Sequence, residues 1–214
     1  MSNVTIYGVA PSTYARTARV AFHEKGVPHA FEEIDFSSGE HRKLHPFGKV
    51  PAMRHGDLVL YETLAICTYA DTAFDGPALQ PSGIQDKAVM LQWFSAFVDY
   101  IYPALVTDIV VERLAKPRRG EVSDEDKIKG RVLEVEHQLS VLEAGFEGRD
   151  FLAGDSLSLA DLVYGPAIAY LPMVPEGAGF LDGKPNINRW FERVSSRESF
   201  AKTNPFPPEQ EAAE

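Results

Sequence analysis

The sequence contains a single cysteine, Cys67, among its 214 residues. One cysteine cannot form an internal disulfide, and it excludes the Cys-x-x-Cys motifs of zinc sites and dithiol redox centres. Because Cys67 lies within an apolar pattern typical of a helix, we expect an inert, packed thiol. His41 and His45 lie four residues apart but lack a cysteine or carboxylate companion, so they predict surface histidines and no metal site.

Basic residues are the scarcer charge: 21 Lys and Arg stand against 31 Asp and Glu, which gives a formal net charge of −10. An acidic surface does not attract a phosphate backbone, so nucleic acid is not an expected partner. The sequence also lacks an uninterrupted apolar run of about 18 residues and a signal-like start. We therefore expect a cytoplasmic protein with no membrane partner.

The first third of the sequence alternates short strand patterns with helix patterns. Strands are predicted at residues 4–7, 30–34, 52–53 and 58–61, helices at 13–25 and 63–74, and a weak helix or loop at 38–44. Gly26 stands where a glycine commonly follows a helix. This order predicts an α/β domain over residues 1–78, with helices packed on one sheet.

The rest of the sequence is predicted to be helical. A long helix over residues 85–115 should be kinked by Pro103, and a second helix begins after Ser123 as its cap. These two helices can pair as an antiparallel hairpin. The pattern predicts an all-α domain over residues 85–203, followed by a Pro- and Glu-rich tail at 204–214 that we expect to be disordered.

One helix start in this second half has a clear local signal. Ser158 and Asp161 have the spacing of a capping box, in which two side chains satisfy the first N–H groups of a helix. This pair predicts a folding device and not a catalytic pair.

The segment from Pro46 to Ile66, PFGKVPAMRHGDLVLYETLAI, is the most informative part of the sequence. Pro51 cannot donate to a sheet, so the backbone of Val50 is left to bind something outside the sheet, such as another peptide. Glu62 and Thr63 then open an apolar helix. Taken singly, Pro51 is an ordinary strand-start proline and Thr63 an ordinary helix cap. Only their joint spacing favours a binding site.

These features together resemble the cytosolic glutathione S-transferases. The segments IYGVAPS, EEIDFSSGEH, PFGKVPAM, GDLVLYETLAI and SLADL carry the resemblance, and the first four are most similar to the phi- and theta-like bacterial branch. The resemblance implies a thioredoxin-like N-terminal domain with a cis-proline at Pro51 and a helical bundle as the C-terminal domain. It also implies detoxification by a cytoplasmic homodimer that conjugates glutathione to small apolar electrophiles.

The resemblance implies a site for each part of glutathione. The cysteinyl portion pairs with Val50 beside Pro51 as an added strand. Glu62 faces the ammonium group of the γ-glutamyl end, and Thr63 with its N–H holds the carboxylate.

The glycyl carboxylate of glutathione has three candidate partners. Lys49 and His41 are expected there, with an ordinary solvated lysine as the alternative role of Lys49. His45 is the third candidate, because only four residues separate His41 from Pro46 and the helix in this region should be short or replaced by a loop.

A glutathione transferase must deliver a thiolate near neutral pH from a thiol whose ordinary pKa is about 8.5. Lowering that pKa by about two units takes roughly 2.7 kcal/mol, which one hydroxyl donor and the positive end of a helix can supply. Ser12, in the loop after the first strand, matches the serine of theta- and phi-like members and is the predicted donor. A plain helix N-cap is its alternative role. Thr13, Tyr14 and Tyr7 are the alternative hydroxyls.

The electrophile is expected to bind against the first long helix of the second domain. Candidate wall residues are Phe97, Tyr100, Tyr102, Tyr164, Tyr170 and Met173. Most aromatic residues at helical spacing belong to a core, so we expect only some of these to bind a ligand. Phe47 is the expected anchor of the homodimer, with packing inside its own chain as the alternative.

Two alternatives to a conjugating transferase remain. A glutathione-dependent isomerase, dehalogenase or peroxidase would use the same first domain with another acceptor pocket. A non-catalytic interaction protein would keep the fold and lose the site. The absence of cysteine from residues 10–16 disfavours the thiol-reductase branches of the family.

Overall fold

The computed structural model describes residues 3–206. The chain divides into two compact units, of which the first contains the chain up to Gln80 and the segment that begins at Ser195. The second unit is Pro81–Val194. The predicted tail at 204–214 therefore lies mostly outside the described residues, which end at residue 206.

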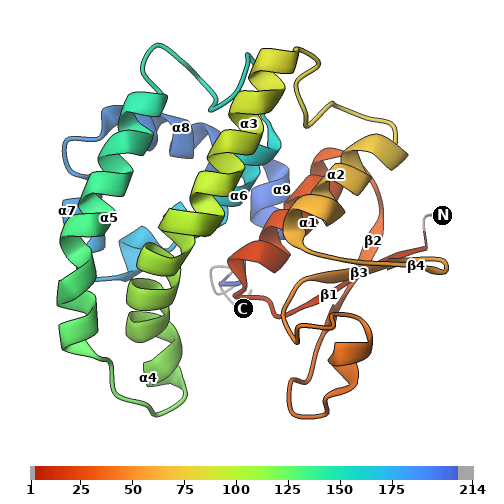
Figure 1. Cartoon of the computed structure of the whole chain (residues 1–214), viewed down its shortest axis with the longest axis horizontal. Coiled ribbons are helices and arrows are strands. Elements are labelled where there is room, and N and C mark those ends of the chain that lie inside the picture. The colour runs from red at the N-terminus through yellow and green to blue at the C-terminus, as the bar shows by residue number, and fades with distance from the viewer. Residues whose placement is uncertain (1–2, 207–214) are drawn as a thin grey trace, which may run out of the picture. The chain divides into compact units, whose positions relative to one another are not determined.

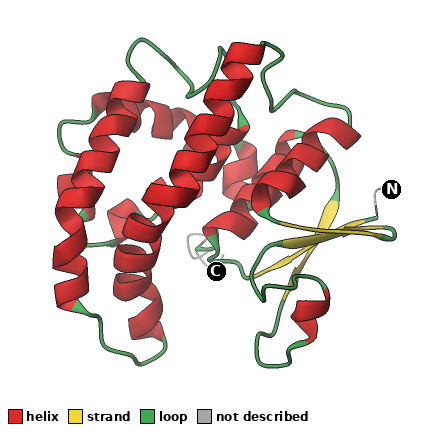
Figure 2. Cartoon of the chain, in the orientation of Figure 1, coloured by secondary structure: helices red, strands yellow, loops and turns green. Residues whose placement is uncertain are grey.

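The first unit is built on a four-stranded sheet with the order β2-β1-β3-β4. Figure 2 shows its strands in yellow. The strands are β1 (Val4–Gly8), β2 (His29–Glu33), β3 (Ala52–His55) and β4 (Leu58–Tyr61). The β1–β2 pair is parallel, and the β1–β3 and β3–β4 pairs are antiparallel. Each strand lies within a few residues of its position predicted from the sequence.

Two helices, α1 (Thr13–Glu24) and α2 (Thr63–Ala73), cover one face of the sheet, and the short turn η1 (Glu40–Lys43) lies on the other (Figure 1). The side chains of β1 alternate, so Val4 and Ile6 face the helices. The core comprises Val4, Ile6, Ala18, Phe22, Val27, Met53, Ile66 and Ala70. The Val50–Pro51 bond is cis. The predicted thioredoxin-like domain with a cis-proline is confirmed, and the helix before Pro46 is indeed reduced to one short turn.

The C-terminal segment adds α9 (Glu198–Lys202) to the first unit, against α1. Arg197 donates two hydrogen bonds to the Glu24 carboxylate, at 2.7 Å from Nε and 2.5 Å from Nη2, and Ser199 donates a further one. Arg16 Nη2 donates to the Phe200 carbonyl at 3.1 Å. These polar contacts attach the last helix to α1, so the second compact unit ends at Val194, whereas the sequence pattern predicted a helical domain over residues 85–203.

The second unit contains helices only, among the residues that the structure describes. Its elements are α3 (Ile84–Ala96), η2 (Phe97–Ala115), α4 (Lys116–Arg118), α5 (Glu125–Gly145), α6 (Leu159–Ile168), η3 (Leu171–Met173), α7 (Gly177–Leu181) and most of α8 (Pro185–Ser195). α3 and η2 form one continuous helical run, and Pro103 lies within the wider, π-type turns of η2. By length and composition the run from Ile84 to Arg118 could cross a membrane, but half of its most apolar window is buried, as in a core helix.

The start of α5 differs from its prediction. Asp124, and not Ser123, is the N-cap, because the Asp124 carboxylate accepts a hydrogen bond from Lys127 N at 3.0 Å. Ser123 Oγ instead donates to the Glu112 carbonyl at 2.7 Å. Ser123 therefore connects the α4–α5 loop to η2.

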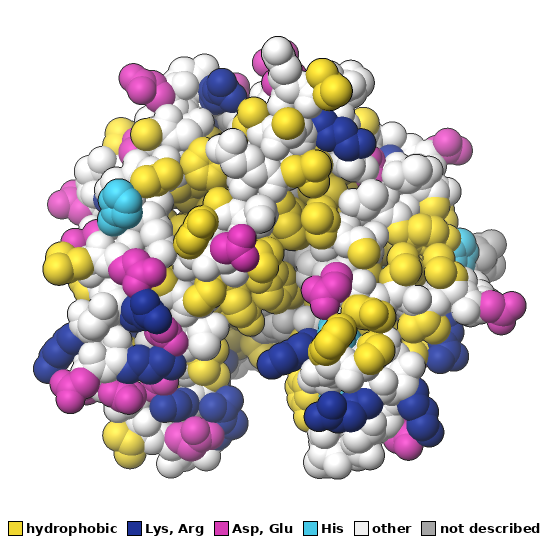
Figure 3. Space-filling view, viewed as in Figure 1, with side chains coloured by type: hydrophobic (Ala, Val, Ile, Leu, Met, Phe, Trp, Pro, Cys, Tyr) yellow, Lys and Arg dark blue, Asp and Glu magenta, His cyan; other side chains and the backbone are white. Residues whose placement is uncertain are grey.

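Charged side chains of both signs are interspersed around the α4–α5 end (Figure 3). Asp108 pairs with Lys127 and with Arg131, each at 2.7 Å. Glu112, which is 2 % exposed, pairs with Lys116 at 2.8 Å. These ion pairs give the buried carboxylates of Asp108 and Glu112 basic partners.

Candidate active site

The sheet register brings three predicted segments to one edge of the first unit. Tyr7 is paired with Ala52, and Ala52 is paired with Tyr61. At this edge β1 and β4 end and β3 begins. The segment after Tyr7, the segment before Ala52 and the segment after Tyr61 therefore lie next to one another. These segments carry Ser12, Val50–Pro51 and Glu62–Thr63, respectively.

Ser12 is the N-cap of α1 and is partly exposed. Its Oγ accepts a hydrogen bond from Ala15 N at 3.2 Å. A hydroxyl has one donor hydrogen in addition to its acceptor lone pairs, so capping leaves the O–H bond able to point at a ligand. The first turn of α1 contains no acidic residue that would offset the positive end of the helix. Ser12 can therefore cap α1 and still donate a hydrogen bond to a ligand.

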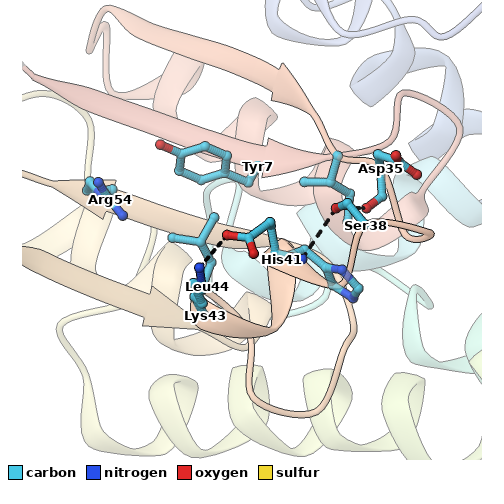
Figure 4. Close-up of a pocket in the computed structure, with 9 residues that line it drawn as sticks. Tyr7, Asp35, Ser38, His41, Lys43, Leu44 and Arg54 are labelled. Atoms are coloured by element: carbon cyan, nitrogen blue, oxygen red, sulfur yellow. Dashed lines mark hydrogen bonds and ion pairs between the residues drawn. The ribbon is translucent and has the colours of Figure 1, made fainter.

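The alternative hydroxyls differ from Ser12 in their surroundings. Thr13 is 3 % exposed and belongs to the packed face of α1. Tyr14 is half-buried on the same helix. Tyr7 lies on the sheet face opposite α1, where its ring is directed toward Arg54 and away from Ser38 (Figure 4). It lines a surface cavity of about 340 Å³ with residues of η1.

Glu62 has an unusual backbone at the start of α2. Its φ of 71° is the only positive value among the non-glycine residues that the structure describes. Such a conformation costs about 1–3 kcal/mol and is concentrated at ligand-binding positions. The Glu62 side chain makes no capping hydrogen bond, and Thr63 is 5 % exposed behind it. The Glu62 side chain therefore leaves the first N–H groups of α2 uncapped.

The two predicted surface histidines are in fact buried. His41 is 7 % exposed and His45 is 2 % exposed, because the short turn η1 folds them against the sheet. Both ring nitrogens of His41 and Nδ1 of His45 are buried with no hydrogen-bond partner among residues 3–206. Buried polar atoms normally have partners, so these imidazoles have hydrogen-bonding capacity that the described residues do not use. Lys49, in contrast, is exposed.

His45 and Phe47 lie on the Glu62 side of this edge. His45 Nε2 is 3.9 Å from Glu62 Oε1, and the His45 ring packs at 5.0 Å from that of Tyr61. Phe47 is 68 % exposed, although its ring lies 6.0 Å from that of Tyr61. Packing inside its own chain therefore leaves most of Phe47 uncovered.

The aromatic residues considered for the electrophile fall into two groups. Phe97, Tyr164 and Tyr170 are buried, and the Phe97 and Tyr164 rings pack together at 5.0 Å. Tyr100 is 61 % exposed and Met173 39 % exposed, while Tyr102 is half-buried. The first group belongs to the core, so these three residues are not exposed for contact with a ligand.

Cys67 is fully buried on α2, as predicted. Burial raises the pKa of its thiol, because the thiolate would lose its hydration. Cys67 is therefore an inert packing residue.

Comparison with known proteins identifies the fold. A family model described as glutathione S-transferase, N-terminal domain, matches residues 11–73, and the C-terminal domain model matches residues 95–198. Glutathione S-transferase 1 of Zea mays is 30% identical over 94% of this chain and 96% of its own length. The chain belongs to the glutathione S-transferase family. Glutathione S-transferase F6 of Arabidopsis thaliana is also 30% identical, over 94% of this chain and 99% of its own.

Solved glutathione S-transferases share the fold. The apo form of glutathione S-transferase III has a TM-score of 0.87 at 27% identity, over 98% of this chain and all of the other. A glutathione S-transferase-I bound with lactoylglutathione has a TM-score of 0.86 at 29% identity, over 95% and 99%. The protein is thus a glutathione transferase with glutathione as co-substrate, as predicted. The enzymatic interpretation is favoured over the non-catalytic interaction protein.

Proposed function

We propose that the edge carrying Ser12, Val50 and Glu62 binds glutathione and that the Ser12 hydroxyl donates a hydrogen bond to its sulfur. The observation that carries this proposal is the sheet register, which brings these three segments together at one edge. The hydrogen bond and the positive end of α1 favour the thiolate over the thiol. The thiolate then attacks a small apolar electrophile.

The two ends of glutathione have separate partners in this proposal. Glu62 binds the γ-glutamyl ammonium, Thr63 and the start of α2 bind the adjacent carboxylate, and Val50 pairs with the cysteinyl backbone. His45 lies beside Glu62 at 3.9 Å, which favours the γ-glutamyl side for this residue. His41, whose buried nitrogens lack partners, and the exposed Lys49 are therefore the proposed ligands of the glycyl carboxylate.

The remaining parts of the proposal concern the second unit, the dimer and the family branch. We assign the acceptor surface to the helical unit, with Tyr100 and Met173 as candidate contacts because they are exposed. A homodimer anchored by Phe47 is supported by the 68 % exposure of that ring. The similarity to plant glutathione transferases supports a phi-like branch and a cytoplasmic location. A bacterial branch rests on the sequence segments alone.

The substitution Ser12→Ala tests the assignment of the thiol donor. We expect retained binding of S-hexylglutathione, a shift of the bound thiol pKa toward about 8.5, and a loss of turnover on the order of 100-fold near neutral pH. The thiolate absorbance measured against pH reports the shift. Unchanged ionisation and turnover would remove Ser12 from the mechanism.

A matched pair of variants separates the donor role from the capping role. Ser12→Thr keeps both a capping oxygen and an O–H donor, so its thiol pKa should stay close to that of the wild type. Ser12→Asp keeps a capping acceptor but supplies a carboxylate in place of the O–H donor. It should therefore retain the stability of α1 in urea unfolding and still lose the thiolate. Recovery of the thiolate in Ser12→Asp would show that capping alone matters.

A further inference from the structure

His45 is a buried imidazole held beside an exposed carboxylate. Its side chain is 3 % exposed, whereas that of Glu62 is 66 % exposed, and Nε2 lies 3.9 Å from Glu62 Oε1. The backbone fixes this position, because His45 N donates to the His41 carbonyl and the His45 carbonyl accepts from Gly48 N, both at 2.8 Å. The ring packs against that of Tyr61 at 5.0 Å. The backbone bonds and the packing of the ring therefore hold His45 beside Glu62.

The charge of His45 depends on a small set of neighbours. Burial lowers its pKa below the ordinary value, the Glu62 carboxylate opposes this shift, and His41 on η1 and Lys49 in the following loop reinforce it. The rings of Tyr61 and Phe47 are its aromatic neighbours. His45 is therefore neutral at neutral pH and becomes a buried cation beside Glu62 only below its lowered pKa.

We propose that His45 is a positioning residue for Glu62 and a proton-sensitive switch on the γ-glutamyl end of the site. The inference rests on the proposed function, because it takes the ammonium group of glutathione as the ligand of Glu62. Neutral His45 supports the strained Glu62 segment from behind and leaves the carboxylate to the ammonium. Protonated His45 competes for that carboxylate and repels the ammonium, so it releases this end of the substrate.

The sign of the pH dependence follows from linkage. The bound ammonium disfavours a second positive charge beside Glu62, so binding lowers the pKa of His45 further and expels its proton. Affinity is therefore complete above the pKa of His45 in the free protein and falls as the pH drops below it. The fall is at most about tenfold per pH unit, because one proton is linked to binding.

Calorimetric titration with S-methylglutathione tests the inference, because this ligand has no ionisable thiol. Between about pH 7 and about pH 5 the ligand ammonium stays largely protonated and the ligand carboxylates stay ionised. We expect the dissociation constant of the wild type to rise toward the acid end, by at most about tenfold per pH unit, and that of His45→Asn to lack this rise. His137→Asn, which removes an exposed histidine on α5, is the matched control and should keep the wild-type slope.

Two further measurements isolate the contact between His45 and Glu62. Glu62→Gln should bind more weakly and lose the His45-dependent slope, because it removes the shared carboxylate. A glutathione analogue with a glutaryl group in place of γ-glutamate lacks the ammonium and should show no such slope in the wild type. In steady-state kinetics the KM of His45→Asn for glutathione should lack the acid limb of the wild type, a pH-specific change that a general loss of structure would not produce.

The outcomes separate this inference from the proposed function. An acid slope that persists in His45→Asn, or pH-independent binding by the wild type, overturns the role of His45 and leaves the glutathione site in place. Failure of the wild type to bind S-methylglutathione at any pH overturns the proposed function itself. If His45→Asn does not fold, His45→Phe retains a ring against Tyr61 and is expected to give the same flat profile.

Discussion

The starts of α2 and α6 look alike in the sequence, since each combines a hydroxyl residue with an acid, but their structures differ. At α6, the Asp161 carboxylate accepts hydrogen bonds from Ser158 N, Leu152 N and Trp190 Nε1 at 2.9–3.0 Å, and from Ser158 Oγ at 2.8 Å. Asp161 is fully buried. At α2, the Glu62 side chain caps nothing and is mostly exposed.

This comparison teaches how a folding device differs from a binding position. Polar groups that are buried and fully paired within the chain stabilise the fold and have nothing left for a ligand. Glu62 has instead a backbone conformation that costs energy and a carboxylate available at the surface. The start of α6 therefore contributes stability, whereas that of α2 carries a strained backbone and an unpaired cap position at the proposed glutathione site.

The largest expected effect comes from breaking the α6 start. Asp161→Ala leaves the buried donors of Leu152 and Trp190 without an acceptor, so we expect a loss of about 3–5 kcal/mol in the free energy of unfolding. Urea denaturation measures the loss. Asp161→Asn keeps an acceptor and should lose less. A change below about 1 kcal/mol in Asp161→Ala would contradict the structural role.

A smaller effect is expected on binding when the charge at α2 is removed. Glu62→Gln should raise the dissociation constant for glutathione about tenfold to a hundredfold, because the ammonium loses a charged partner. The free energy of unfolding should change little. Isothermal titration calorimetry measures the affinity, and Glu32→Gln, an exposed glutamate on β2, is the matched control. Equal affinities of Glu62→Gln and the control would remove Glu62 from the site.

The smallest expected effect comes from removing the backbone strain at the start of α2. Glu62→Gly should stabilise the protein by about 1 kcal/mol while weakening glutathione binding, because glycine adopts a positive φ without strain. Thermal unfolding measures the gain. Glu32→Gly, in extended backbone on β2, should lose about 0.5–1 kcal/mol. Loss of stability in Glu62→Gly would mean that the side chain, and not the backbone, dominates this position.

Much of the fold could be predicted because its signals are local. The strand and helix positions follow from apolar periodicity, and the capping box at Ser158 and Asp161 is written in four consecutive residues. The cap of α5 was misassigned to Ser123 because Asp124 beside it is an equally good cap, and only the contact of Ser123 with Glu112 separates them.

The candidate site was predictable as a set of residues but not as an arrangement. Ser12, Val50, Pro51, Glu62 and Thr63 were predicted as site residues from their spacing and from the family resemblance. The burial of His41 and His45 was missed, because a short polar segment with no apolar period resembles a surface loop. The sequence did contain a signal for this burial. Only four residues separate His41 from Pro46, and so short a segment keeps both histidines close to the sheet.

The sequence by itself determined the family, the α/β and helical halves, and the residue types available to hold glutathione, since each depends on neighbours within a few positions along the chain. Only the tertiary structure decided that three segments meet at one sheet edge, that residues from Ser195 return to α1, and that His45 faces Glu62. Burial and distance between residues far apart in the chain are set by packing, and no local pattern encodes them.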